Sequence, residues 1–230
     1  MRFQDAAPDG RAVVYAAIQA DPLVARAAAL LAGADRAGMI LARAVMNGTQ
    51  TDPAAWRAMF PSLFSGSAPA ATRDRAEAIL AVSLEVADRG EEVRSQVRGA
   101  IVEALAALLL ARRGPAFATA VRRERRILFD GVPAEIHPYD VTVELAGRAE
   151  AWDCKWGARG IGPDVLHQLD DARRHALDEA AAMTVGLIVF DAERSCRVRL
   201  GRQTAPHGET RLIAIETLAR LAASTARSAP

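Results

Sequence analysis

The chain has 230 residues, a formal net charge of +1 and 25% charged residues. This length is sufficient for a substantial core, either as one domain or as a domain with a helical extension. The small net charge excludes a global basic field, so any surface for nucleic acid must be local. The first residues lack a signal-like apolar stretch, and no apolar run approaches the roughly 18 residues of a membrane span. We therefore expect a cytoplasmic protein without membrane contact.

Metal chemistry based on cysteine is not indicated. The two cysteines, Cys154 and Cys196, are far apart in the sequence. They form no CxxC motif and no Cys/His ligand spacing. A structural zinc site and an iron–sulfur cluster are therefore not expected.

The first part of the chain is predicted to be helical. Apolar residues recur at helical spacing, Asp21-Pro22 is typical of a helix start, and Asn47-Gly48 is typical of a stop. Turn-forming residues between 51 and 69 indicate a linker or an irregular connection. Helices are predicted within residues 11–47, 54–59, 72–88 and 91–113. We predict a helical N-terminal region of unknown role at residues 1–90 and a second domain at residues 91–230.

After Gly114 the hydrophobic period changes from that of helices to that of strands. Residues 139–145 alternate cleanly, which predicts a half-buried strand, and a tight turn at 146–148 leads into a second strand, so the two strands should form a hairpin. Further strands are expected at residues 118–129, 183–190, 195–200 and 211–215, with helices at 163–182 and 216–223. This order predicts an α/β fold with a mixed sheet flanked by helices.

The predicted hairpin carries the residues of chemical interest. A hairpin with a short turn can bring Asp140 and Asp153 side by side on the polar face of adjacent strands. Two carboxylates at such a short distance repel each other unless a cation lies between them. Oxygen ligands favour a hard cation such as Mg²⁺. Lys155 shares the strand face of Asp153. The set is suited to phosphodiester hydrolysis, because metal and lysine can both neutralise charge on a phosphoryl group.

Lys155 is the single lysine among the 29 lysine and arginine residues of the chain. Arginine elsewhere serves as the ordinary surface cation. Lysine differs in being a compact point charge that fits where a planar guanidinium does not. The alternative is a lysine that persists by chance or in a fitted core ion pair.

Glu103 is an isolated acid in a nearly all-apolar helical stretch between Arg98 and Arg112. A buried carboxylate is costly unless it is compensated. A metal where this helix meets the sheet would supply the compensation. Alternatively, Glu103 reaches solvent on a narrow polar stripe or pairs with an arginine.

These residues resemble the PD-(D/E)xK, or restriction-endonuclease-like, nucleases. The matching positions are Gly99…Glu103 in a helix, Asp140 on one strand and Asp153-Cys154-Lys155 on the next. The resemblance covers about residues 91 to 220. It departs from the name-giving pattern because Tyr139, not proline, precedes Asp140. The resemblance implies a core of one helix, a three-stranded antiparallel meander, a crossover helix and further strands.

The resemblance also implies roles for the site residues. Its metal, Mg²⁺ or Mn²⁺, would be held by Asp140, Asp153, the backbone carbonyl of Cys154 and Glu103, with Lys155 catalytic and Gln168 facing the site. Gln168 can equally be a solvated helix residue. Within the run Arg122-Arg-Glu-Arg-Arg126, Arg122 is a candidate phosphate contact, although such a run is also typical of a solvated face.

The sequence thus predicts a metal-dependent nuclease that acts on DNA, in repair or in defence. The N-terminal helices would contribute substrate selection or a homodimer interface. The alternative is a catalytically inactive PD-(D/E)xK-fold binding module for nucleic acid or protein. In that module Asp140, Asp153 and Lys155 would form only an ion-pair cluster.

Overall fold

The computed structural model describes residues 1–6, 10–133, 137–205 and 210–223. Contacts divide the chain into two compact units. The sheet unit comprises Met1–Ala7 and Ala106–Pro230, and the helical unit comprises Pro8–Leu105. The division falls inside one continuous helix, α7 (Glu91–Ala111). The predicted domain boundary at residue 90 stays a prediction.

The sheet unit contains a seven-stranded mixed sheet in its described residues. Its strands are β1 (Arg2–Asp5), β2 (Val121–Phe129), β3 (Val132–Pro133), β4 (Tyr139–Leu145), β5 (Arg148–Lys155), β6 (Ala182–Val189) and β7 (Arg211–Ile213). The order is β1-β2-β4-β5-β6-β7, and β3 pairs with β2. The pairs from β1 to β5 are antiparallel, whereas β5, β6 and β7 are parallel. The coarse prediction of an α/β fold with a mixed sheet is confirmed.

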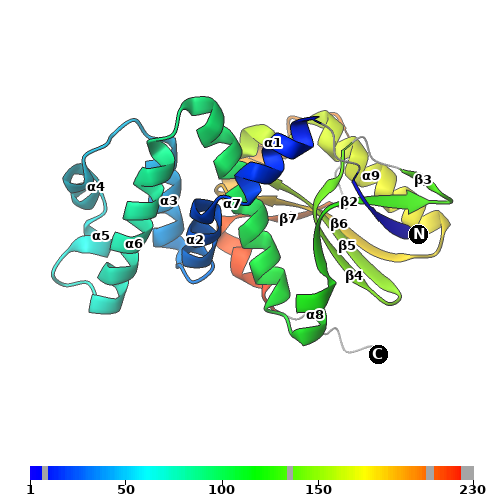
Figure 1. Cartoon of the computed structure of the whole chain (residues 1–230), viewed down its shortest axis with the longest axis horizontal. Helices are drawn as coiled ribbons and strands as arrows, with labels where there is room; N and C mark the ends of the chain where they lie inside the picture. The colour runs from blue at the N-terminus through cyan, green and yellow to red at the C-terminus, as the bar shows by residue number, and fades with distance from the viewer. Residues whose placement is uncertain (7–9, 134–136, 206–209, 224–230) are drawn as a thin grey trace. The chain divides into compact units, whose positions relative to one another are not determined.

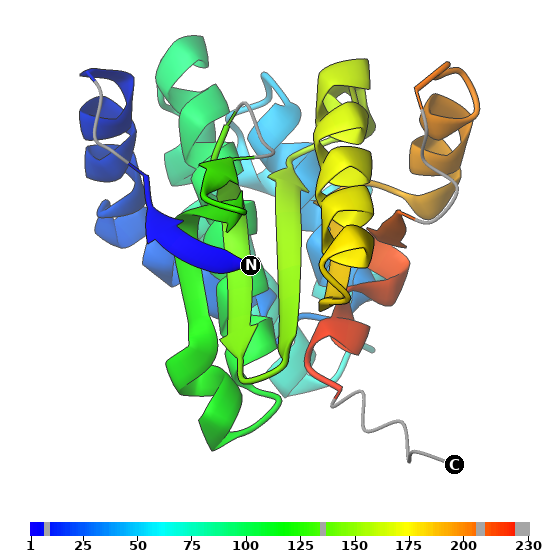
Figure 2. The ribbon, with the colours of Figure 1, turned by 90° about the vertical axis from the view of Figure 1, so that its right-hand side faces the viewer.

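Helix α9 (Pro163–Asp178) makes the crossover that parallel pairing of β5 and β6 requires. It lies along one face of the sheet (Figure 2). Leu166, Leu169 and Ala172 of α9 join a buried apolar cluster with Val185 and Leu187 of β6. The remaining helical segments of this unit are α8 (Pro115–Ala120), η1 (Ala158–Gly160), α10 (Glu193–Leu200) and η2 (Ile215–Leu221).

Strands β4 and β5 form the predicted hairpin. Their register runs from Leu145↔Arg148 to Val141↔Trp152. Gly147 supplies the left-handed backbone of the turn, with φ of +73°. In β5 every residue from Ala149 to Cys154 is buried. Polar side chains at this end of the sheet therefore lie within the protein rather than on a solvated face.

A buried ion pair joins the segment after α7 to β5. The guanidinium of Arg113 donates to Glu150 at 2.6 Å and to the carbonyl of Leu221 at 2.6 Å. Glu150 also accepts from the indole of Trp152 at 3.1 Å. Neither charged side chain of the pair is more than 4% exposed. This ion pair holds the segment that follows α7 against the middle of β5.

The helical unit consists of α1 (Gly10–Gln19), α2 (Pro22–Leu31), α3 (Arg36–Asn47), α4 (Pro53–Met59), α5 (Pro61–Phe64), α6 (Ala70–Ala87) and the first part of α7. Asp21, Asp35 and Asp52 cap α2, α3 and α4 by accepting from backbone N–H groups. Helix α6 packs against α2 and α3 (Figure 1). The predicted helix starts at Asp21-Pro22 and stops at Asn47-Gly48 are confirmed.

Four elements differ from the expectations. Residues 118–120, expected to begin a strand, are the last turn of helix α8, and strand β2 starts only at Val121. Strand β1 lies within residues 1–90, which were expected to be helical, and it pairs with β2. Residues 195–200 form part of helix α10 rather than a strand. An exposed i,i+4 pair between Glu193 and Arg197 adds a small stabilisation to this helix. Residues 216–223 were expected to be an α-helix, but the 3₁₀ helix η2 occupies most of this segment.

Within the described residues, no single helix has the length and apolarity to cross a membrane, although α2 and most of α1, bent by 52°, meet those two criteria as a pair.

We expect Glu150→Gln to destabilise the sheet unit, because it leaves the Arg113 guanidinium as a buried charge without its counter-ion. Loss of one partner of a buried pair costs about 3–5 kcal/mol. Asp171→Asn breaks an exposed pair with Arg174 on α9 and should cost less than about 1 kcal/mol. Urea unfolding measures both. Equal, small effects would show that the buried pair adds little to stability.

Candidate metal centre

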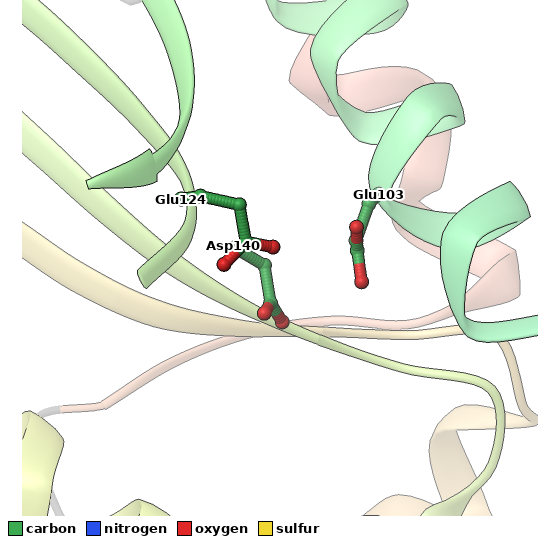
Figure 3. A group of neighbouring side chains, drawn as sticks. All are labelled: Glu103, Glu124 and Asp140. Atoms are coloured by element: carbon green, nitrogen blue, oxygen red, sulfur yellow. The ribbon is translucent and has the colours of Figure 1, made fainter. Parts of the chain in front are cut away.

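Two carboxylates lie side by side on neighbouring strands, Glu124 on β2 and Asp140 on β4 (Figure 3). The β2–β4 register includes Arg123↔Val141 and Arg125↔Tyr139 but leaves out the position between them. Glu124 occupies that gap with a φ of +53°, a left-handed conformation that is unfavourable for a residue other than glycine. Local strain of this kind is frequent at functional sites.

Asp140 lies where β4 and β5 stop pairing. The ladder extends to Val141↔Trp152. Beyond it, the Asp140 carboxylate accepts a hydrogen bond from the backbone N–H of Cys154 at 2.5 Å. A side chain thus replaces the backbone acceptor that a continued ladder would supply. This contact orients the carboxylate at the end of the hairpin.

Glu103 stands on α7 and is only 3% exposed. Its burial excludes the alternative of a side chain that reaches solvent. Its carboxylate accepts hydrogen bonds from the hydroxyl of Tyr15 and from the amide of Gln19, the latter at 2.8 Å. These donors on α1 compensate part of the cost of burial.

One oxygen each from Glu103, Glu124 and Asp140 lies within 4.8 Å of the other two. Figure 3 shows the three side chains, Glu103 on its helix and Glu124 and Asp140 on strands of the sheet. This acidic triad could hold a metal ion.

The donor set fits a hard divalent cation. All three groups offer carboxylate oxygens, which are the ligands that Mg²⁺ and Ca²⁺ favour. Like charges this close are unfavourable without a cation or a shared proton. The chemistry of the donors restricts the class of metal and leaves its identity open.

Asp153 is not a member of the triad. Its carboxylate, on a residue that is 7% exposed, forms an ion pair with the ammonium of Lys155. Burial lowers the pKa of Lys155, but the negative charges of Asp153 and Asp140 outweigh burial and raise that pKa above the ordinary value for lysine. Lys155 is therefore a protonated cation at neutral pH, close enough to Asp140 for their charges to interact.

The surroundings of Lys155 hold it tightly. A Cβ at Gly160 would lie 3.0–3.2 Å from three carbons of the lysine side chain, so the aliphatic part of Lys155 packs against turn η1. Asp191 fixes that turn by accepting from the N–H of Ala158 at 3.0 Å. The carbonyl of Lys155 accepts from the N–H of Phe190 at 2.8 Å. The side chain of Lys155 is therefore held by packing, and its backbone is held by a hydrogen bond.

The other predicted residues have local partners. The amide of Gln168 is 6% exposed and bonds to the backbone N–H and carbonyl of His137, at 3.3 and 3.0 Å. It is not the solvated residue of the alternative reading, and it anchors the chain just before β4. The Arg122 guanidinium donates to the carbonyls of Thr119 and Val121 on the exposed surface. Cys154 contributes its N–H to Asp140, and its role as a carbonyl ligand stays a prediction.

Glu124 was missed by sequence reasoning. It lies at the centre of the run Arg122-Arg-Glu-Arg-Arg126, which drew attention to its arginines. One acid among four arginines was the available signal. Its partnership with Asp140 depends on the β2–β4 register and on the left-handed backbone, neither of which the sequence specifies directly.

Comparisons with family models, curated proteins and solved structures find no match to this chain.

We expect Mn²⁺ to bind at the triad and expect Asp140→Asn or Glu124→Gln to weaken binding by at least about tenfold, or about 1.4 kcal/mol, because each removes a charged ligand. Asparagine at 140 keeps an acceptor for Cys154, so the fold should persist. Calorimetric titration measures the affinities. Glu92→Gln, at an exposed acid on α7, is the matched control and should bind like the wild type. If the wild type and the three variants bound Mn²⁺ with equal affinity, the metal would bind at another site.

Proposed function

We propose that this protein is a metal-dependent nuclease of the PD-(D/E)xK type that hydrolyses phosphodiester bonds in DNA. The observation that carries the proposal is a triad of carboxylates with a packed, protonated lysine close to one of them. The order of elements agrees with the core that the resemblance implies. Helix α7 is followed by antiparallel β2, β4 and β5, then by crossover helix α9 and parallel β6.

The proposed ligand set differs from that of the motif alone. Glu103, Glu124 and Asp140 would hold the cation, with Asp153 near it through its ion pair with Lys155. A bound Mg²⁺ or Mn²⁺ would orient and activate a water molecule and offset charge on the phosphoryl group. Asp153 orients Lys155, whose ammonium offers donors to the negative oxygens of the phosphate. Asp140 is a member of the triad and interacts with Lys155, so the proposed metal and the lysine ammonium would lie at the same end of the hairpin.

The substrate, partners and location belong to the same proposal. DNA is preferred as the substrate, with Arg122 as a phosphate contact on the exposed part of β2. Gln168 would act by holding the segment that leads into β4. A homodimer through the N-terminal helices, a role in repair or defence and a cytoplasmic location remain predictions.

The alternative is an inactive binding module with the same fold. One observation favours it: Asp153 and Lys155 satisfy each other's charge as an ion pair. A structural pair would need neither metal nor substrate. The two proposals differ in their prediction for cleavage.

Cleavage of linear and circular DNA in Mg²⁺ or Mn²⁺ tests the proposal. We expect the wild type to release fragments only when a divalent metal is present, and Asp140→Asn and Glu124→Gln to be inactive although circular dichroism shows them to be folded. Glu92→Gln should cleave normally. A wild type that binds metal but cleaves neither DNA nor RNA would favour the inactive module.

We expect Lys155→Arg to lose cleavage while keeping its fold. The lysine ammonium is a compact cation that contacts Asp153, and the larger planar guanidinium presents its donors in a different geometry. A loss of kcat of at least about 100-fold is expected for removal of a group that stabilises transition-state charge. The measurement is single-turnover cleavage with metal affinity checked separately. Retained cleavage would remove Lys155 from the proposed chemistry.

Gly160→Ala should lower kcat and leave metal affinity unchanged. Its Cβ would approach the Lys155 side chain to 3.0–3.2 Å, so the lysine must shift by a few tenths of an ångström. Small misplacements of a catalytic group reduce rate more than binding. Gly162→Ala is the matched control, because a Cβ there meets nothing within 4 Å. If both variants cleave at the wild-type rate, the packing around Lys155 does not limit catalysis.

A further inference from the structure

The carboxylate of Glu103 is held by two side chains of α1. The hydroxyl of Tyr15 donates to one oxygen, and the amide of Gln19 donates to the other at 2.8 Å. The two donors are four residues apart, so they lie on one face of α1. An ionised carboxylate has about four lone-pair sites, so each oxygen can accept a further partner after these two bonds.

Gly99 makes the approach of Tyr15 possible. It precedes Glu103 by four residues on α7, so the two positions lie one above the other on the helix. A Cβ at Gly99 would lie 3.2 Å from the Tyr15 hydroxyl oxygen, closer than an ordinary contact. Glycine is otherwise unfavourable inside a helix. Its presence leaves space for the hydroxyl directly below the carboxylate.

We propose that Tyr15 and Gln19 are positioning residues for the metal ligand Glu103, and that Gly99 provides the space for Tyr15. This inference rests on the proposed metal site. It gives helix α1 a function in the site. Held from both oxygens, the carboxylate presents its remaining lone pairs in a fixed direction. Groups that orient ligands in this way typically change metal affinity when they are removed.

The test is Mn²⁺ affinity by calorimetry in the full chain. Tyr15→Phe removes only the hydroxyl, and we expect roughly tenfold weaker binding with the thermal midpoint little changed. Gly99→Ala should weaken Mn²⁺ binding in the same way, although alanine favours the helix. The two effects should not add in the double variant, because both act through one hydrogen bond.

Gly38→Ala is the matched control for a purely structural effect. Its Cβ would lie 3.1 Å from Ile79 in the core of the helical unit, so it should lower the thermal midpoint and leave Mn²⁺ affinity unchanged. Wild-type affinity in Tyr15→Phe, or an equal loss of affinity in Gly38→Ala, overturns the positioning role. If the wild type binds no Mn²⁺, both the metal site and this inference are overturned. If the wild type and Tyr15→Phe bind Mn²⁺ equally well, only this inference is overturned.

Discussion

Mutual repulsion of three carboxylates is the constraint that organises the site. Glu103, Glu124 and Asp140 place oxygens within 4.8 Å of one another. Charges this close in a partly buried place are unfavourable unless they are offset. The protein offsets two of them: α1 donates to Glu103, a backbone N–H of β5 donates to Asp140, and the charge of Lys155 acts on Asp140. A metal ion held by the three oxygens would offset the charge that remains.

The sheet keeps the triad in place through features that cost stability locally. Glu124 holds a left-handed backbone, and the β4–β5 ladder ends one residue short of Asp140. Such distortions persist only where the surrounding structure determines them. The buried pair of Arg113 and Glu150 and the apolar contacts of α9 stabilise the sheet unit that contains them. The interruptions in the ladder let side chains, rather than backbone groups, occupy the end of the hairpin.

Local patterns predicted the coarse fold. The alternation of residues 139–145 and Gly147 indicated the hairpin, and Asp21-Pro22 marked the start of α2. Strand β1 could not be predicted, because its pairing with β2 joins residues far apart in the sequence. Residues 195–200 alternate like a strand, yet they form a helix. The candidate site has the same limit: Asp140 was identified from one hairpin, whereas the position of Glu124 beside it depends on long-range register.

The surroundings of Lys155 separate the roles of its stem and of its charged end. Its stem lies against Gly160, and its ammonium meets Asp153. The stem contacts involve the first three carbons of the side chain, which arginine also possesses. The difference between the two residues therefore lies in the charged end. A guanidinium is wider and presents its donors in a fixed plane, so it would not reproduce the compact contact of the ammonium with Asp153. A position that depends on a compact cation is the one place in this chain where lysine differs in kind from arginine.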